Sequence, residues 1–273
     1  MPGLTRRSLM AVVPFAALPT LLTSRRQAAA GVLRRIEGGP GVGDLYPSQD
    51  PDDVRAVVGA SHAQLDAVTR MVTKRPALAK ASWDWGFGDW ETALGAASHT
   101  GQRAIADLLI QHGARPNLFT FAMFGQVDVV RAICTANPGI QRIPGPHGIT
   151  LMRHARAGGA ESQDVVDYLT QLGDADLSPT NLPLDEAAAA IYLGAYEPAA
   201  APGVMLIVNW NQRQGGITIQ RDDRTPRGLL NEGAHLFHPA GGERVEITFD
   251  VTDGPAGALT IRDGDLTLSA ERV

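Results

Sequence analysis

Histidine is the residue type in this chain that is best suited to acid–base or metal chemistry. Imidazole titrates near neutral pH and is a common metal ligand. His235 and His238 lie three residues apart in an expected strand or turn, so their side chains should face opposite sides. His62, His99 and His112 fall at the ends of expected helices, where polar side chains cap the backbone. We therefore predict surface or capping roles for these histidines and no metal or other cofactor, with a metal site as the alternative.

Known catalytic motifs are missing from the sequence. It contains no G-x-S-x-G elbow, no S-x-x-K with a companion K-T-G, no H-E-x-x-H, no P-loop and no dinucleotide fingerprint. The single cysteine, Cys134, cannot form an intramolecular disulfide and is expected on the buried side of a helix. We predict a protein that is not an enzyme. The alternative is an enzyme of unrecognised type that uses His147, His154, Arg153 and Asp84.

Composition argues against a nucleic-acid partner. The 273 residues carry a formal net charge of -5, and the basic residues are scattered rather than gathered in a stripe that could neutralise phosphates. Hydrophobic residues make up 44% of the chain and charged residues 19%. This balance is typical of globular domains that bury a core.

The most unusual segment is residues 83–91, Trp-Asp-Trp-Gly-Phe-Gly-Asp-Trp-Glu, which holds three of the four tryptophans. These rings either cover the neighbouring helices or anchor a protein partner, because tryptophan dominates the binding energy of many interfaces. Aromatic residues of the next segment and polar residues near 150 could extend such a surface. The candidate protein-binding residues are Trp83, Asp84, Trp85, Phe87, Asp89, Trp90, Glu91, Phe119, Phe121, His147, Arg153 and His154.

Residues 1–30 have the layout of a secretory signal, with a charged start, an apolar middle and a small-residue cleavage site. The Arg6-Arg7 pair resembles that of a twin-arginine signal. The apolar middle is shorter than the about 20 residues that cross a bilayer, which disfavours a membrane anchor. We predict cleavage after Ala30, export to the periplasm or the extracellular space, and no stable membrane insertion. A Gly- and Pro-rich flexible linker is expected over residues 31–50.

One pattern recurs through residues 51–176. A helix ends near Ala-x-x-Gly or Ala-x-x-Ala, and a second helix follows with aliphatic residues at helical spacing. About three steps of about 32 residues separate Ala63 from Gly158, close to the 33-residue ankyrin period. Neighbouring units of this kind must stack, because none can bury its apolar face alone.

Two segments carry a resemblance to ankyrin repeats. Residues 92–101, Thr-Ala-Leu-Gly-Ala-Ala-Ser-His-Thr-Gly, are similar to the ankyrin opening T-P-L-H-x-A-A-x-x-G, with Ala93 and Gly95 in place of Pro and His. Residues 108–117, Leu-Leu-Ile-Gln-His-Gly-Ala-Arg-Pro-Asn, match the ending L-L-L-x-x-G-A-D-P-N. The resemblance implies about four degenerate repeats that bind another protein through their fingers and concave face.

From residue 191 the sequence changes to short alternating apolar runs, after a linker over residues 177–190. This texture predicts a small antiparallel sheet or barrel over residues 191–273. Residues 192–196, Tyr-Leu-Gly-Ala-Tyr, are similar to the Y-x-G-x-Y opening of a small β domain found behind β-lactamase-like serine hydrolases. The expected strand runs are Ile191–Tyr196, Val204–Trp210, Gly216–Arg221, His235–His238, Arg244–Val251, Ala258–Arg262 and Asp265–Glu271.

The sequence thus predicts an ankyrin α-solenoid followed by a separate small antiparallel all-β domain. The expected function is non-catalytic binding of another protein in the periplasm or cell envelope. The alternative is binding of a carbohydrate or other ligand by the β domain, through Trp210, His235 and His238.

Overall fold

The computed structural model describes residues 46–222 and 224–273. The predicted leader over residues 1–30 lies outside the described residues, as does most of the predicted linker over 31–50. Met1–Ser48 belongs to one unit of the chain, and Gln49–Val273 forms a second, compact unit. Within the described residues, no helix combines the length and hydropathy that a membrane span requires.

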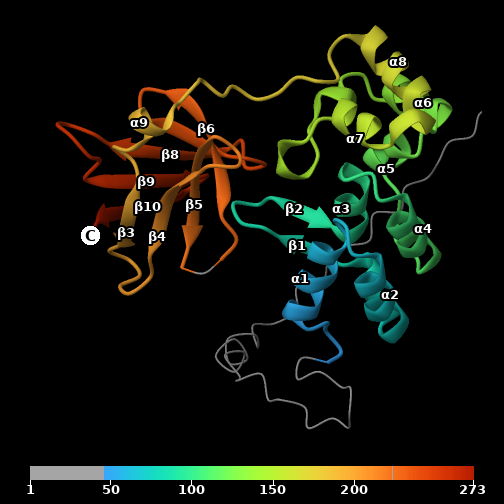
Figure 1. The fold of residues 1–273 in the computed structure, drawn as a ribbon, viewed down its shortest axis with the longest axis horizontal. Coiled ribbons are helices and arrows are strands. Elements are labelled where there is room, and N and C mark those ends of the chain that lie inside the picture. The colour runs from blue at the N-terminus through green and yellow to red at the C-terminus, as the bar shows by residue number, and fades with distance from the viewer. Residues whose placement is uncertain (1–45, 223) are drawn as a thin grey trace, which may run out of the picture. The chain divides into compact units, whose positions relative to one another are not determined.

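The first part of the compact unit consists of short helices joined by tight turns (Figure 1). Consecutive helices pack in pairs around apolar residues such as Val58, Leu109, Leu151 and Leu169. Four short 3-10 helices join them: η1 (Pro76–Lys80), η2 (Ile140–Arg142), η3 (Pro146–Gly148) and η4 (Gly159–Ser162). The α-helices are α1 (Pro51–Ala60), α2 (Leu65–Lys74), α3 (Ala93–His99), α4 (Arg103–Gln111), α5 (Leu118–Met123), α6 (Val127–Ala136), α7 (Leu151–Ala157), α8 (Gln163–Leu172) and α9 (Glu186–Ala189).

Side-chain caps set where several of these helices begin. Asp50, Thr92, Asn117, Thr150 and Asp185 each accept a hydrogen bond from a backbone N–H of the first turn that follows. Such caps satisfy N–H groups that have no partner inside the helix. The helix starts are therefore fixed by local sequence.

Gly101, in the turn between α3 and α4, permits a close approach between two helix pairs. Its φ is +69°, and a Cβ at this position would collide with the backbone carbonyl of Ala157 in α7. A left-handed backbone costs other residues roughly 1–2 kcal/mol, and a clash with fixed backbone adds to this cost. We expect Gly101→Ala to lower the free energy of unfolding by about 2 kcal/mol or more, as measured by urea denaturation.

Gly139 provides the matched control for that substitution. It also has a positive φ, +92°, but no atom lies within 4 Å of the position its Cβ would take. Gly139→Ala should therefore lower the free energy of unfolding only by the backbone cost of about 1 kcal/mol. Equal losses in the two variants would show that the approach of Ala157 does not constrain residue 101.

A β-hairpin separates α2 from α3. Strand β1 (Ser82–Asp84) pairs antiparallel with β2 (Trp90–Thr92), in a register that places Trp83 opposite Glu91. The hairpin tip passes through three consecutive positive φ angles, at Gly86, Phe87 and Gly88. Phe87 packs against the core of the C-terminal barrel.

The C-terminal strands form a closed antiparallel barrel in the order β10-β3-β4-β5-β6-β7-β8-β9, drawn in orange to red in Figure 1. Pairing of β10 with β3, in which Ala270 faces Pro198, closes it. Alternate residues such as Val208, Ile219, Ile247 and Leu259 are buried, as expected for strands with one face turned to a core. The strands are β3 (Gly194–Pro198), β4 (Leu206–Asn211), β5 (Gly216–Arg221), β6 (Arg227–Gly233), β7 (Leu236–Pro239), β8 (Val245–Asp250), β9 (Ala258–Asp263) and β10 (Leu266–Arg272).

This architecture corrects the predicted fold class. The prediction of an ankyrin α-solenoid with a separate β domain is wrong, because the described residues have a mixed α/β architecture with a closed eight-stranded barrel and a two-stranded hairpin. The repeat-like pattern in 92–101 and 108–117 reflects only local helix pairing. Helices and barrel belong to the same compact unit, and contacts of the hairpin, which the pattern did not predict, join them.

Candidate metal centre

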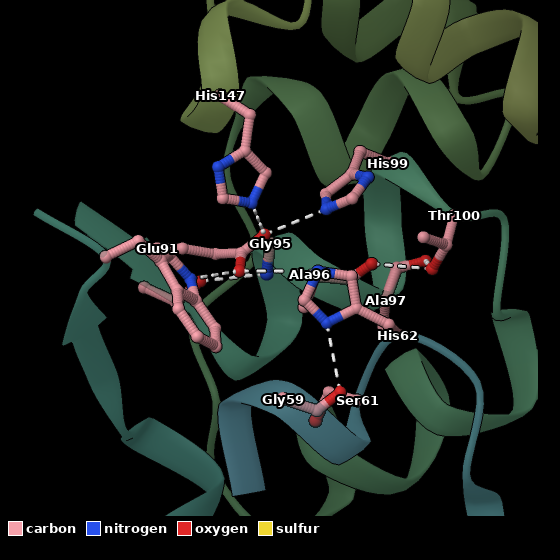
Figure 2. Close-up of polar contacts among 12 residues, drawn as sticks. Gly59, Ser61, His62, Glu91, Gly95, Ala96, Ala97, His99, Thr100 and His147 are labelled. Carbon is pink, nitrogen blue, oxygen red and sulfur yellow. Dashed lines mark hydrogen bonds and ion pairs between the residues drawn. The ribbon is translucent and has the colours of Figure 1, made fainter. Parts of the chain in front are cut away.

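Four side chains from separate parts of the compact unit converge on one point (Figure 2). They are His62 in the turn after α1, Glu91 in the middle of β2, His99 at the end of α3, and His147 in η3. One ligand atom from each of these residues lies within 4.8 Å of the others. Within the described residues, this is the group of histidines and acids whose geometry suits a metal ion.

The carboxylate of Glu91 is the centre of the cluster, and its side chain is 0% exposed. Its Oε1 lies 2.8 Å from Nε2 of His99 and 3.4 Å from Nε2 of His147. Its Oε2 lies 3.5 Å from Nε2 of His62. Three imidazoles therefore direct the same type of nitrogen toward one carboxylate.

A second set of hydrogen bonds orients these groups. Nδ1 of His62 donates to the carbonyl oxygen of Gly59 at 3.0 Å. Nδ1 of His147 donates to Oδ2 of Asp89 at 2.6 Å, and the indole N–H of Trp85 donates to Oε2 of Glu91 at 2.7 Å. Outer partners of this kind fix the ring orientation of metal-binding histidines and leave Nε2 for the ion.

Local structure explains why Glu91 points inward. In β2 the residues alternate exposed, buried, exposed, so Glu91 faces the interior while Trp90 and Thr92 face solvent. Thr92 then caps α3 by accepting a hydrogen bond from Gly95 N at 2.8 Å. This cap fixes the start of the helix that ends at His99.

His147 is held in a strained backbone conformation. Its φ is +61°, in the left-handed region that costs non-glycine residues roughly 1–2 kcal/mol. Its backbone N–H donates to Oδ1 of Asp89 at 2.8 Å, while its ring binds Oδ2 of the same carboxylate. Asp89 therefore holds both the backbone and the ring of His147.

The charges of the cluster are perturbed by these contacts. Burial alone would raise the pKa of Glu91, but hydrogen bonds from His147 and His99 outweigh burial and lower the pKa to about 2. Burial would lower the pKa of His147, but Asp89 and Glu91 raise it to about 9. In the absence of a cation, the cluster therefore holds ionised Glu91 and an imidazolium at His147.

The donor set fits a divalent transition metal. Three imidazole nitrogens and one carboxylate oxygen suit ions of the zinc and iron class, whereas calcium and magnesium prefer oxygen ligands. Metal–ligand bonds of roughly 2.0–2.2 Å place the ligands of one ion roughly 3–4 Å apart. The distances from Glu91 to the three histidines already fall near this range, so small side-chain rotations suffice.

A cavity of about 1050 Å³ adjoins the cluster. His62, His147 and Trp85 form part of one wall, and Arg227 of β6 contributes to another. The segment over residues 181–185 and residues of β5 and β6 also line the cavity. The side chains of His62 and His147 are 31% and 21% exposed, so this side of the cluster is open to a ligand.

Arg227 links the barrel to the cluster. Its guanidinium forms an ion pair with Oδ2 of Asp89 and donates to the carbonyl oxygen of Ala240 at 2.6 Å. Asp89 in turn bonds His147. Burial would raise the pKa of the Asp89 carboxyl, but its contacts with His147 and Arg227 outweigh burial and lower the pKa. An Arg–Asp–His chain thus runs from β6 to the cluster.

The structure gathers only some of the predicted site residues. Trp85, Asp89, Glu91 and His147 lie in or beside the cluster. Trp90 points away and is 63% exposed, which leaves it accessible to a partner. Partner binding by the predicted residues stays a prediction.

The remaining predicted residues lie elsewhere. Arg153 is exposed, and Oδ1 of Asp84 accepts a hydrogen bond from Gly86 N. His154 is fully buried beside Phe119. Burial lowers its pKa to about 4, although a hydrogen bond to the Thr150 carbonyl acts in the opposite direction. Among the others, Trp83 packs on the first helical core, Phe87 on the barrel core and Phe121 on the core around α5–α8.

The three residues of the alternative ligand site each make a contact with the barrel, and ligand binding through them stays a prediction. His235 Nδ1 pairs with the hydroxyl of Tyr192 at 2.8 Å, and His238 Nδ1 donates to the carbonyl oxygen of Val245 at 2.8 Å. Trp210 packs against the barrel core. These three side chains are engaged in separate structural contacts.

His62 and His99 were predicted at helix ends, where they lie, in surface or capping roles. The ring of His62 does bond the Gly59 carbonyl at the end of α1, but the meeting of both rings at Glu91 was not predicted. Arg227 was missed because the run 227–233 was not among the expected strands. The short alternation of residues in this run, in which Arg227 and Leu229 are buried, was the signal that could have indicated a strand. No local spacing indicates that these residues meet.

Comparisons with known proteins provide no family for this chain. No family model and no curated protein matches it. Among solved structures, the crystal structure of SurE is similar, with a TM-score of 0.24 and 21% sequence identity. The similarity covers 44% of this chain and 28% of the SurE chain. A TM-score this low assigns neither a fold nor a function to this chain.

Proposed function

We propose that this protein binds one divalent transition-metal ion through His62, His99, His147 and Glu91 and acts on a small ligand in the adjoining cavity. The observation that carries the proposal is the convergence of three Nε2 atoms on a fully buried carboxylate. Two of these rings are oriented from behind by Nδ1 hydrogen bonds to Gly59 and Asp89. Such an outer set is typical of metal-binding histidines.

A purely ionic role explains this arrangement less well. One cation suffices to balance Glu91, and the imidazolium of His147 supplies it. His62 and His99 then face the same carboxylate although charge compensation does not require them. A metal ion uses all four groups at once and replaces protons that the nitrogens share with Glu91.

The cavity favours a reactive or ligand-binding metal over a structural one. Catalytic sites keep a position open to substrate or water, and beside four protein ligands this requires an ion that takes five or six ligands. When bound, the metal would act as a Lewis acid that polarises water or a ligand oxygen. The protein contributes orientation: Asp89 fixes the ring of His147, and Trp85 occupies Oε2 of Glu91, leaving Oε1 for the ion.

Metal binding itself tests this proposal. We expect the protein without an affinity tag to retain one equivalent of zinc or iron after dialysis, as determined by elemental analysis. After chelation, Co²⁺ should restore a one-to-one complex with visible absorption bands. The double variant His62→Ala, His99→Ala should bind Co²⁺ at least tenfold more weakly, because two of four ligands are lost.

His112 supplies the matched control. It also lies at a helix end, and its Nδ1 donates to the carbonyl oxygen of Leu108, away from the cluster. His112→Ala should bind Co²⁺ as the unmodified protein does. A stoichiometry below one in the unmodified protein, or equal affinity in the double variant, would overturn the proposal.

A further inference from the structure

A second cavity, of about 460 Å³, lies between the hairpin tip and the barrel. Strands β4, β5, β9 and β10 supply one side, and the segment over residues 83–88 supplies the other. Trp85 and Arg227 border both cavities, but none of the four clustered metal-binding side chains lines this one. The metal centre therefore does not account for it.

Apolar side chains form the floor of this second cavity. Leu206, Ile219 and Ile261 are buried residues of the barrel core. Leu268 adds to the floor, and Phe87 closes it from the hairpin side. The positive φ of Phe87, +60°, marks a strained turn that the surrounding packing holds in place. The floor suits a hydrocarbon chain or ring.

Arginines surround the same cavity. The arginines that line it are Arg55 of α1, Arg221 at the end of β5, Arg224 in the loop that follows, and Arg227 of β6. Arg227 is paired with Asp89, and Nε of Arg221 lies 3.5 Å from Asp222. Neither of the other two has a carboxylate partner among the described residues, and the guanidinium of Arg55 donates to Oγ1 of Thr225 at 3.2 Å.

Two carboxylates also line the cavity, and one of them is already engaged. Oδ1 of Asp84 accepts a hydrogen bond from the backbone of Gly86 at 2.8 Å. The other carboxylate is that of Asp263, at the end of β9. With Arg221 and Arg227 engaged by carboxylates, Arg55 and Arg224 are the guanidinium groups that can bind an anion beside the apolar floor, and this arrangement suits a ligand with an anionic head and an apolar tail.

We propose that this second cavity binds an amphipathic organic anion, a hydrocarbon chain of medium length that ends in one carboxylate. The carboxylate lies between Arg55 and Arg224, and the tail covers Leu206, Ile261 and Leu268. The cavity volume falls within the roughly 300–1,000 Å³ that is usual for small-molecule sites. None of the four proposed metal ligands lines this site, and the proposal requires no bound metal.

Binding of decanoate, below its micellar concentration, tests the proposal on the intact protein. Quenching of tryptophan fluorescence and calorimetry should show saturable one-to-one binding, since Trp83 and Trp85 line the cavity. Each buried methylene contributes about fourfold in affinity, so octanoate, which is two methylenes shorter, should bind about fifteenfold more weakly than decanoate. Decylammonium, which carries the opposite charge, should bind at least tenfold more weakly than decanoate.

Charge removal identifies the site. The double variant Arg55→Gln, Arg224→Gln should lose at least tenfold in affinity for decanoate and keep its affinity for uncharged decanol. Arg213→Gln, in the exposed turn between β4 and β5 outside this cavity, is the matched control and should bind decanoate normally. Thermal unfolding of each variant verifies that it is folded.

The outcomes separate this site from the metal centre. Decanoate should bind with the same affinity before and after metal chelation. This expectation does not depend on whether the metal proposal is correct. Absence of decanoate binding, equal binding of decylammonium, or full affinity in the folded double variant would each overturn the proposal. Leu268→Gln is a second variant, which loses an apolar contact with the tail. It should bind decanoate and decanol more weakly to the same extent.

Discussion

Replacing Arg227 with methionine is expected to lower the free energy of unfolding by about 3–5 kcal/mol. Arg227 and Asp89 are 9% and 2% exposed, and their ion pair joins the barrel to the hairpin. Removing one partner of a buried pair leaves the other charge desolvated, which costs about this much. Urea denaturation of the two proteins measures the difference. Asp89→Asn should be similarly destabilising, since it leaves Arg227 unpaired.

A double-mutant cycle separates the ion pair from simple loss of packing. The combined variant Asp89→Asn, Arg227→Met removes both charges, so it should lose clearly less stability than the sum of the single variants. A coupling of about 2 kcal/mol is expected from such a buried pair. Additive losses would contradict a direct interaction and would mean that each residue acts through separate contacts.

Replacing Glu91 with glutamine should lower the free energy of unfolding of the metal-free protein by about 3 kcal/mol at neutral pH. The pKa of Glu91 is about 2 in the folded protein, against an ordinary value of 4.5, because hydrogen bonds from His147 and His99 outweigh its burial. Each unit of pKa corresponds to about 1.4 kcal/mol of stability. Glutamine preserves the shape of the side chain but not the charge that the histidines face.

The pH dependence of stability follows from the same pKa. Because the folded value lies below the unfolded one, the stabilisation is complete above about pH 4.5 and is lost as the pH falls through about 2. In the presence of chelator, the unmodified protein should therefore lose about 3 kcal/mol more than Glu91→Gln over this range. Denaturant unfolding at stepped pH values measures both curves. Parallel curves would show that ionised Glu91 does not stabilise the fold.

The segment over residues 83–91 was recognisable from sequence because of its unusual composition, but its role was not. Asp89 and Glu91 were predicted to bind a partner protein, whereas both are buried and bond to histidines. The register of the hairpin decides this outcome. Strand alternation turns Glu91 inward and Trp90 outward, and composition alone does not reveal that phase.

The predicted ankyrin solenoid shows the limit of local similarity. Small residues and turn glycines such as Gly101 and Gly125 specify tight helix turns, and these turns are present. In a solenoid, each unit also stacks on its neighbours and contacts only those neighbours. Here the hairpin after η1 and the ion pair of Asp89 with Arg227 join the helices to a barrel.

The sequence by itself determined the local elements: capped helices, glycine turns, and short alternating strands after residue 191. These depend on contacts within a few residues, namely backbone hydrogen bonds, caps and the periodicity of apolar side chains. Only the tertiary structure decided that His62, Glu91, His99 and His147 meet. Their meeting depends on packing among α1, the hairpin, α3 and η3, and a site assembled from distant segments leaves no fixed spacing in the chain.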